Sequence, residues 1–263
     1  SHRAEATPIA RDSALSGRWP REFAGAVNVA PIPSGCCRDG STANRVLWAC
    51  GGSKFEDAMP GRMFLERPLT EVASVVGIDD VPKGEPPRRN IAPGEDVIVC
   101  TPGNRLVRMR WGMIPVGRVN ARGRPVLETI INARSETVFD KTAFEGVGRA
   151  VVPADGWYEW TGKARRKKAW RIRPRSGELL LFAAITDVWE APGGRSVHQV
   201  ATVTCEPSAD VRDVHHRMGV LIAADALETW LHGEETLART LMRPFPDGRL
   251  IVEPADDVDW NAP

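Results

Sequence analysis

The sequence predicts an α+β domain built around a mostly antiparallel, partly closed and barrel-like β-sheet with helices at its flanks. Short segments with strand character follow one another through the middle of the chain, separated by Pro, Gly and Asp residues. Helical patterns stand before and after this run of strands, which favours segregated helices and strands. We find no internal repeat. The simplest division is therefore one domain over residues 59–263, preceded by a disordered extension over 1–58.

The composition is that of a soluble globular protein, with 42% hydrophobic and 26% charged residues in a chain of 263. Apolar runs such as Leu179–Ile185 reach only strand length, which excludes a membrane-spanning protein. The formal net charge of +1 neither requires nor excludes nucleic acid as a partner. A binding site for anions must therefore come from local clusters of basic residues.

The five cysteines form an odd set with irregular spacing, and none has the spacing of zinc ligands. Free thiols in a reducing compartment are the expectation, with no bound metal. Residues 1–58 are rich in Ala, Arg, Ser, Gly and Pro and show no periodicity, which is typical of a disordered segment. The first methionine is Met59, and translation from it would leave this extension outside the protein.

The expected elements follow in chain order. A helix over 68–77 combines an early Pro, apolar residues at helical spacing and a final Gly. A Pro-rich loop over 81–93 comes next. The expected strands are 96–100, 105–111, 130–134, 150–153, 157–160, 169–173, 179–184 and 197–204. Helical patterns return at 207–214, 224–232 and 234–241, and a last strand fits 250–253.

The segment Asn132–Thr137 follows the end of an apolar strand and is almost entirely polar. Asn132 offers a paired donor and acceptor, and Arg134 offers a planar fork of donors that suits a phosphate. The same residues also fit the capped start of a helix with Ser135 as the N-cap. The segment by itself leaves both interpretations open.

Glu159 stands among large aromatic rings near the end of a strand. Strand alternation places Trp157 and Glu159 on one face and Tyr158 and Trp160 on the other. A carboxyl buried against aromatic rings has a raised pKa, which suits general acid and base catalysis. The alternative is an ordinary strand glutamate that points into solvent.

Two basic segments are candidates for the recognition of anions. Histidine is the side chain whose ordinary pKa lies near neutrality, so His215 is a candidate for proton transfer, and Arg217 two positions later can hold an anion. The neighbouring His216 points in a different direction and no third ligand is evident, so we expect no metal here. Residues 163–168 form a basic tip between two strands, which is either a solvated loop or a contact to a phosphate backbone.

Taken in order, these motifs resemble the SRAP family, the SOS-response-associated peptidases that are also called abasic-site processing proteins. The matching segments are Gly61–Phe64, Asn90–Pro93, Arg110–Pro115, Ile131–Thr137, Gly156–Trp160 and His215–Met218. The resemblance extends from about Met59 to Trp230. It implies a protein of the DNA-damage (SOS) response that recognises abasic sites in single-stranded DNA. We expect a monomer in the cytoplasm, associated with the nucleoid, that needs no cofactor and touches no membrane.

The resemblance also implies roles for individual residues. In the family, a cysteine exposed by removal of the initiator Met condenses with the aldehyde of the opened abasic sugar and closes a thiazolidine. The resemblance assigns sugar orientation and proton transfer to Asn132, Glu159 and His215. The residues implied in DNA binding are Arg62, Trp111, Arg134, Ser135, Trp160 and Arg217, with Trp111 supporting an unstacked base.

The sequence departs from the family pattern where the cysteine belongs. The expected Met-Cys-Gly-Arg reads Met59–Pro60–Gly61–Arg62, so Pro60 takes the catalytic position without a thiol. A smaller departure is Gly219, where the family usually has Pro. One hypothesis is covalent crosslinking or lyase chemistry of altered form.

Two other hypotheses remain open. The chain can be a module that binds single-stranded or damaged DNA without covalent chemistry. It can also be a peptidase that uses Ser135 with His215, although no oxyanion-hole motif such as G-x-S-x-G is present. The presence of Asn132, Glu159 and His215 together favours an enzyme over simple binding, because binding alone does not need a Glu and a His.

Overall fold

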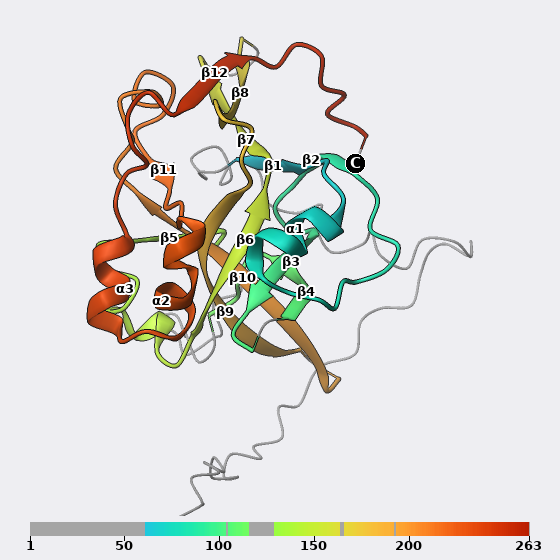
Figure 1. Cartoon of the computed structure of the whole chain (residues 1–263), viewed down its shortest axis with the longest axis vertical. Helices are drawn as coiled ribbons and strands as arrows, with labels where there is room; N and C mark the ends of the chain where they lie inside the picture. Colours follow the sequence, from blue (N-terminus) through green and yellow to red (C-terminus); the bar gives the residue numbers. More distant parts are fainter. Residues whose placement is uncertain (1–60, 104, 116–128, 164–165, 192, 263) are drawn as a thin grey trace, which may run out of the picture. The chain divides into compact units, whose positions relative to one another are not determined.

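The described strands form two β-sheets (Figure 1). The computed structural model describes residues 61–103, 105–115, 129–163, 166–191 and 193–262. Met59, Pro60 and the predicted extension over 1–58 lie outside these residues, as does part of the basic tip at 164–165. The described residues therefore belong to the predicted domain over 59–263.

The first sheet has five described strands in the order β12-β8-β7-β1-β2, and each neighbouring pair is antiparallel. Its strands are β1 (Arg62–Leu65), β2 (Arg88–Ile91), β7 (Gly156–Thr161), β8 (Lys168–Pro174) and β12 (Leu250–Pro254). In the pairing of β1 with β7, Met63 lies opposite Trp157. This pairing places β1, the first described strand, next to the central strand β7.

The second sheet is partly closed. Its strands are β3 (Asp96–Thr101), β4 (Arg105–Trp111), β5 (Asn132–Arg134), β6 (Gly148–Ala154), β9 (Leu180–Ala191), β10 (Arg195–Cys205) and β11 (Met218–Gly219). Along the order β11-β10-β4-β3-β6-β9, the last strand also pairs with β10, so that β10, β4, β3, β6 and β9 form a ring. Among the described strands of this sheet, only the pairings of β10 with β4 and β5 are parallel. The predicted mostly antiparallel, partly closed sheet is confirmed.

Helices flank these sheets, as the sequence predicts (Figure 1). They are α1 (Leu69–Val76), the 3₁₀ turns η1 (Thr142–Phe144) and η2 (Ala224–Ala226), α2 (Leu227–His232) and α3 (Glu235–Leu241). Helix α1 starts after Pro68 and ends at Gly77, whose φ of 70° lies in the left-handed region that glycine favours. The Trp230 indole fixes α2 on β6 by a 2.8 Å hydrogen bond from Nε1 to the carbonyl oxygen of Ala150.

Two expectations about secondary structure are wrong. Strand β2 lies inside the predicted loop over 81–93, where its pairing with β1 outweighs the neighbouring prolines. The predicted helix over 207–214 is a series of turns. Its side chains bond to other segments instead of supporting a helix: the Asp210 carboxylate accepts 3.0 Å hydrogen bonds from the backbone N–H groups of Gly248 and Leu250.

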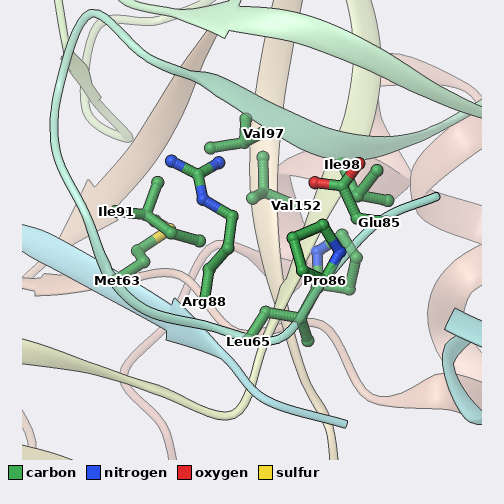
Figure 2. A pocket seen from close by; sticks show the side chains of 10 residues that line it. Met63, Leu65, Glu85, Pro86, Arg88, Ile91, Val97, Ile98 and Val152 are labelled. Atoms are coloured by element: carbon green, nitrogen blue, oxygen red, sulfur yellow. The ribbon is translucent and has the colours of Figure 1, made fainter. Parts of the chain in front are cut away.

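The hydrophobic core lies between the inner faces of the two sheets. Figure 2 shows Met63 and Ile91 of the first sheet facing Val97 and Val152 of the second. The hollow between them measures about 10 Å³, the space of one water molecule, and is therefore a packing gap. Arg88 lines this gap, and its guanidinium donates 2.5 Å hydrogen bonds to the Asp96 carbonyl and the Glu95 carboxylate.

Candidate functional site

Glu159 is a carboxyl buried at the inner face of the first sheet. It is 3% exposed and shares this face with the fully buried Trp157 and with Trp170, which lies opposite it on β8. Burial disfavours the charged form, so it raises the pKa of Glu159 well above the ordinary glutamate value. A hydrogen bond of 3.1 Å from the backbone N–H of Gly61 to Oε1 acts in the opposite direction. Of the two orientations that the sequence left open, the structure has the buried one, and a carboxyl with a raised pKa suits proton transfer.

Gly61 lies between this carboxyl and the ring of Trp160 on the outer face of β7. A Cβ atom at position 61 would lie 2.7 Å from the Trp160 ring, so glycine allows the backbone to pass between the ring and the carboxyl. Gly61 directly follows Pro60, which lies outside the described residues. In the sequence, Gly61 is recognisable only as part of a motif. Its bond to Glu159 depends on the pairing of β1 with β7, which the sequence does not reveal.

Asn132 occupies the first position of β5, beside Thr202 of β10. The Thr202 hydroxyl donates a hydrogen bond to Oδ1 of Asn132 and so fixes the orientation of the amide. Nδ2 is buried, and no acceptor for it occurs among the described residues. Because a buried donor is costly without a partner, this amide N–H is suited to a ligand. Thr202 was missed by the sequence analysis, since it sits inside an apolar strand.

His215 lies in the segment before β11, with its ring stacked on that of His216 at 4.4 Å between centroids. The expectation that these two neighbouring rings point in different directions is therefore wrong. The Nδ1 atom of His215 lies 3.1 Å from the backbone nitrogen and 3.2 Å from the carbonyl oxygen of Arg217. The Arg217 backbone therefore fixes the orientation of the imidazole, a side chain suited to proton transfer.

The guanidinium of Arg217 is hydrogen-bonded to other residues of the protein. Its guanidinium holds the Glu136 carboxylate with two hydrogen bonds of 2.5 and 2.9 Å and also donates to the Thr204 carbonyl at 2.5 Å. This pairing lowers the pKa of Glu136 to about 2. The Arg217 side chain is only 14% exposed. Its bonds to Glu136 and Thr204 hold the segment that carries His215 against the end of β10.

Among the other predicted DNA-binding residues, Arg134 is exposed at the end of β5, whereas Ser135 is buried. The Ser135 N–H donates to the Thr204 carbonyl at 2.8 Å, and its hydroxyl interacts with Glu136. The segment after β5 forms turns, so Ser135 caps no helix. None of these described contacts of Ser135 involves His215, the base that a peptidase mechanism would require.

Trp111 is fully buried at the end of β4 and belongs to the hydrophobic core. The expectation that it lies on a surface that supports an unstacked base is therefore wrong. A ring with no exposed surface cannot stack on a base. Arg62 and Trp160, in contrast, lie on the outer face of the first sheet and keep part of their surface exposed.

The described cysteines do not replace the thiol missing at position 60. Cys100 and Cys205 are free and buried. Burial raises the pKa of Cys100 to about 11 and that of Cys205 to about 12. Both therefore stay protonated near neutral pH, and a thiol in that state is a poor nucleophile.

The structure thus arranges the predicted residues in two groups. Asn132, His215 and Arg217 surround the end of β10, because β5 and β11 both pair with that strand. Glu159 belongs to the first sheet together with Gly61. Within the described residues we find no cluster of three His, Cys, Asp or Glu that could hold a metal ion, and no helix long and apolar enough to cross a membrane.

Comparison with known proteins shows extensive similarity. Residues 59–258 match the family described as SOS response associated peptidase (SRAP). The abasic site processing protein YoaM of Bacillus subtilis is 33% identical over 199 residues, covering 71% of this chain and 86% of YoaM. The abasic site processing protein HMCES of Gallus gallus is 30% identical over 180 residues, covering 59% of this chain and 52% of HMCES.

Solved structures show the same fold. A crystal structure of a protein from Bacteroides thetaiotaomicron matches with a TM-score of 0.65 at 18% identity, covering 75% of this chain and 92% of that one. A crystal structure of a protein from Bordetella bronchiseptica gives a TM-score of 0.63 at 23% identity, covering 74% and 99% respectively. The predicted α+β architecture is therefore shared with known proteins.

Proposed function

This chain belongs to the SRAP family, and on that premise we propose that it processes abasic sites in single-stranded DNA as part of the response to DNA damage. Relatives with 30–33% identity carry the name abasic site processing protein. The observation that carries the proposal is the buried Glu159 carboxyl, hydrogen-bonded to the N–H of the residue that follows position 60. The substrate is DNA whose abasic sugar opens to an aldehyde.

Three residues divide the chemistry in this proposal. Asn132 Nδ2 donates a hydrogen bond to an oxygen of the opened sugar, which satisfies its buried amide. Glu159, whose pKa is raised by burial, gives a proton to the hydroxyl that must leave as water when an amine condenses with the aldehyde. His215 carries protons to and from the sugar through Nε2, while Nδ1 faces the Arg217 backbone.

The attacking group in the proposal is the amine of Pro60. A secondary amine condenses with an aldehyde to an iminium without a thiol. Such an adduct lacks the second nucleophile that closes a thiazolidine, so it reverses or proceeds to β-elimination. The raised pKa values of Cys100 and Cys205 argue against a thiol from elsewhere in the described chain.

Non-covalent binding of single-stranded DNA is the second candidate, favoured by proline at the cysteine position and by the exposed Arg134. The proposed peptidase activity receives no support from the contacts of Ser135. Both proposals place the protein on DNA as a monomer, in the cytoplasm and on the nucleoid. Both assign this role to the domain over residues 59–263.

Binding is tested by fluorescence anisotropy with labelled single-stranded, duplex and abasic single-stranded oligonucleotides over a series of salt concentrations. We expect tighter binding to single-stranded than to duplex DNA, with affinity falling as salt rises, because phosphates release counterions on binding. Arg134→Ala should reduce the salt slope, and Arg195→Ala, at the exposed start of β10, is its matched control. A flat salt response or tighter duplex binding would contradict the proposal.

A further inference from the structure

Three aromatic rings pack together on the outer face of β7. Trp260, in the segment after β12, meets Tyr158 edge-to-face with 5.0 Å between ring centroids. It also contacts Trp160 at 5.2 Å with the ring planes tilted by 57°. Figure 1 shows the segment that carries Trp260 (red) running from β12 back towards β2. Trp260 belongs to none of the motifs recognised in the sequence.

Asn90 anchors this segment to the first sheet. Its Nδ2 donates hydrogen bonds to the carbonyl oxygens of Trp260 at 3.0 Å and Ala262 at 2.8 Å. Its Oδ1 accepts a 2.5 Å hydrogen bond from Nη1 of Arg62. Asn90 is only 4% exposed, so one buried amide fixes both the tryptophan backbone and the guanidinium.

The anchored segment places a cation beside two partly exposed indoles. The Arg62 Cζ atom lies 5.8 Å from the centroid of the Trp260 ring. Trp160 and Trp260 are both only partly buried, unlike Tyr158 beneath them, which is 1% exposed. Indole faces next to an arginine are the combination that stacks on unpaired bases and tracks a phosphate backbone.

We propose that Trp260, together with Trp160, forms a stacking platform for an unpaired base next to the abasic site. The inference rests on the proposed function. The platform begins beside the candidate site, because a Cβ at Gly61 would touch the Trp160 ring while the Gly61 N–H is bonded to Glu159. A base that flanks the lesion on the strand stacks on the indoles, and Arg62 holds an adjacent phosphate.

The test separates stacking on bases from contacts to the backbone. Its probes are a labelled oligothymidylate and an oligomer of the same length built only of stable abasic units, which has phosphates but no bases. Trp260→Ala should weaken binding to oligothymidylate by about 5- to 100-fold and leave binding to the base-free oligomer within about twofold. Trp260→Phe, which keeps a ring, should recover most of the loss.

Trp189→Ala is the matched control, because Trp189 is a partly exposed indole on β9 of the other sheet, opposite Val197. It should change neither affinity. Equal weakening of both probes by Trp260→Ala, or no weakening of either, would overturn the stacking platform. A parent protein that binds neither probe would overturn the proposed function and this inference with it.

Discussion

The backbone N–H of Gly61 donates a 3.1 Å hydrogen bond to Oε1 of Glu159, although 98 positions separate the two residues. The pairing of β1 with β7 produces this contact, since Arg62 lies opposite Tyr158. The same strand that begins the described domain therefore delivers the position after residue 60 to the buried carboxyl. Any reaction at residue 60 takes place next to an acid whose pKa is raised by burial.

Glu159→Gln should stabilise the protein against unfolding, and increasingly so as pH rises. Because burial raises the pKa of Glu159 in the folded state, the protonated carboxyl contributes its full stabilisation below the pKa of the unfolded state. Above that pKa, the free energy of unfolding falls by about 1.4 kcal/mol per pH unit until the pH reaches the raised pKa of the folded state. Urea unfolding from pH 4 to 8 measures the difference between the two proteins.

Glu145→Gln serves as the comparison, because Glu145 is exposed. It should leave the pH dependence of unfolding unchanged. A Glu159→Gln curve that runs parallel to the parent at every pH would show that the carboxyl ionises as easily in the folded as in the unfolded state.

The proton-transfer roles predict that Glu159→Gln and His215→Ala each slow the processing of abasic single-stranded DNA by about 10²–10⁴-fold. Both proteins should remain folded, because Gln can still accept the Gly61 N–H and the His215 ring is only partly buried. Gel assays of product formation under single-turnover conditions measure the rates. His216→Ala, at the exposed neighbouring histidine, should react at the parent rate; parent rates in both test variants would make Glu159 and His215 structural.

Local patterns explain which parts of the fold were predictable. The Pro68 and Gly77 boundaries of α1 and the alternation that buries Glu159 depend on neighbours in sequence, and all are confirmed. The contacts of Glu159 with Gly61 and of Asn132 with Thr202 depend on strand register, which no local pattern encodes. For the same reason, the sequence could not decide whether Trp111 faces a surface or the core.

Gly219 is packed against Phe182, which predicts how this chain responds to a larger residue there. A Cβ at position 219 would lie 2.4 Å from the Phe182 ring. Gly219→Ala should therefore lower the free energy of unfolding by about 1–3 kcal/mol through overpacking. Combining it with Phe182→Leu should cost less than the sum of the two single changes, because the smaller side chain makes room for the new methyl group.

Gly177→Ala is an instructive comparison, because its Cβ would meet no atom within 4 Å, although its φ of 73° adds backbone strain. Phe182→Leu should leave the cost of Gly177→Ala unchanged. Strictly additive effects of Gly219→Ala and Phe182→Leu in thermal unfolding would show that the ring already yields to the new atom.

The final prediction concerns Pro60, whose amine reacts only as a free N-terminus. In a protein that begins at Pro60, the amine attacks the sugar aldehyde and water leaves to give an iminium, which borohydride reduces to a stable protein–DNA complex. Without reduction, loss of a sugar proton and cleavage of the C–O bond to the 3′ phosphate nick the strand. In the 263-residue form the same nitrogen is part of a peptide bond and cannot condense.

Borohydride trapping on abasic single-stranded DNA, followed by denaturing electrophoresis, should therefore give a complex with the Pro60 form alone. Replacing Pro60 by Cys in that form should give a complex that is stable without borohydride, because the thiol closes a thiazolidine. Equal trapping by the long and short forms would assign the reaction to a lysine, and trapping by neither would leave non-covalent binding as the function.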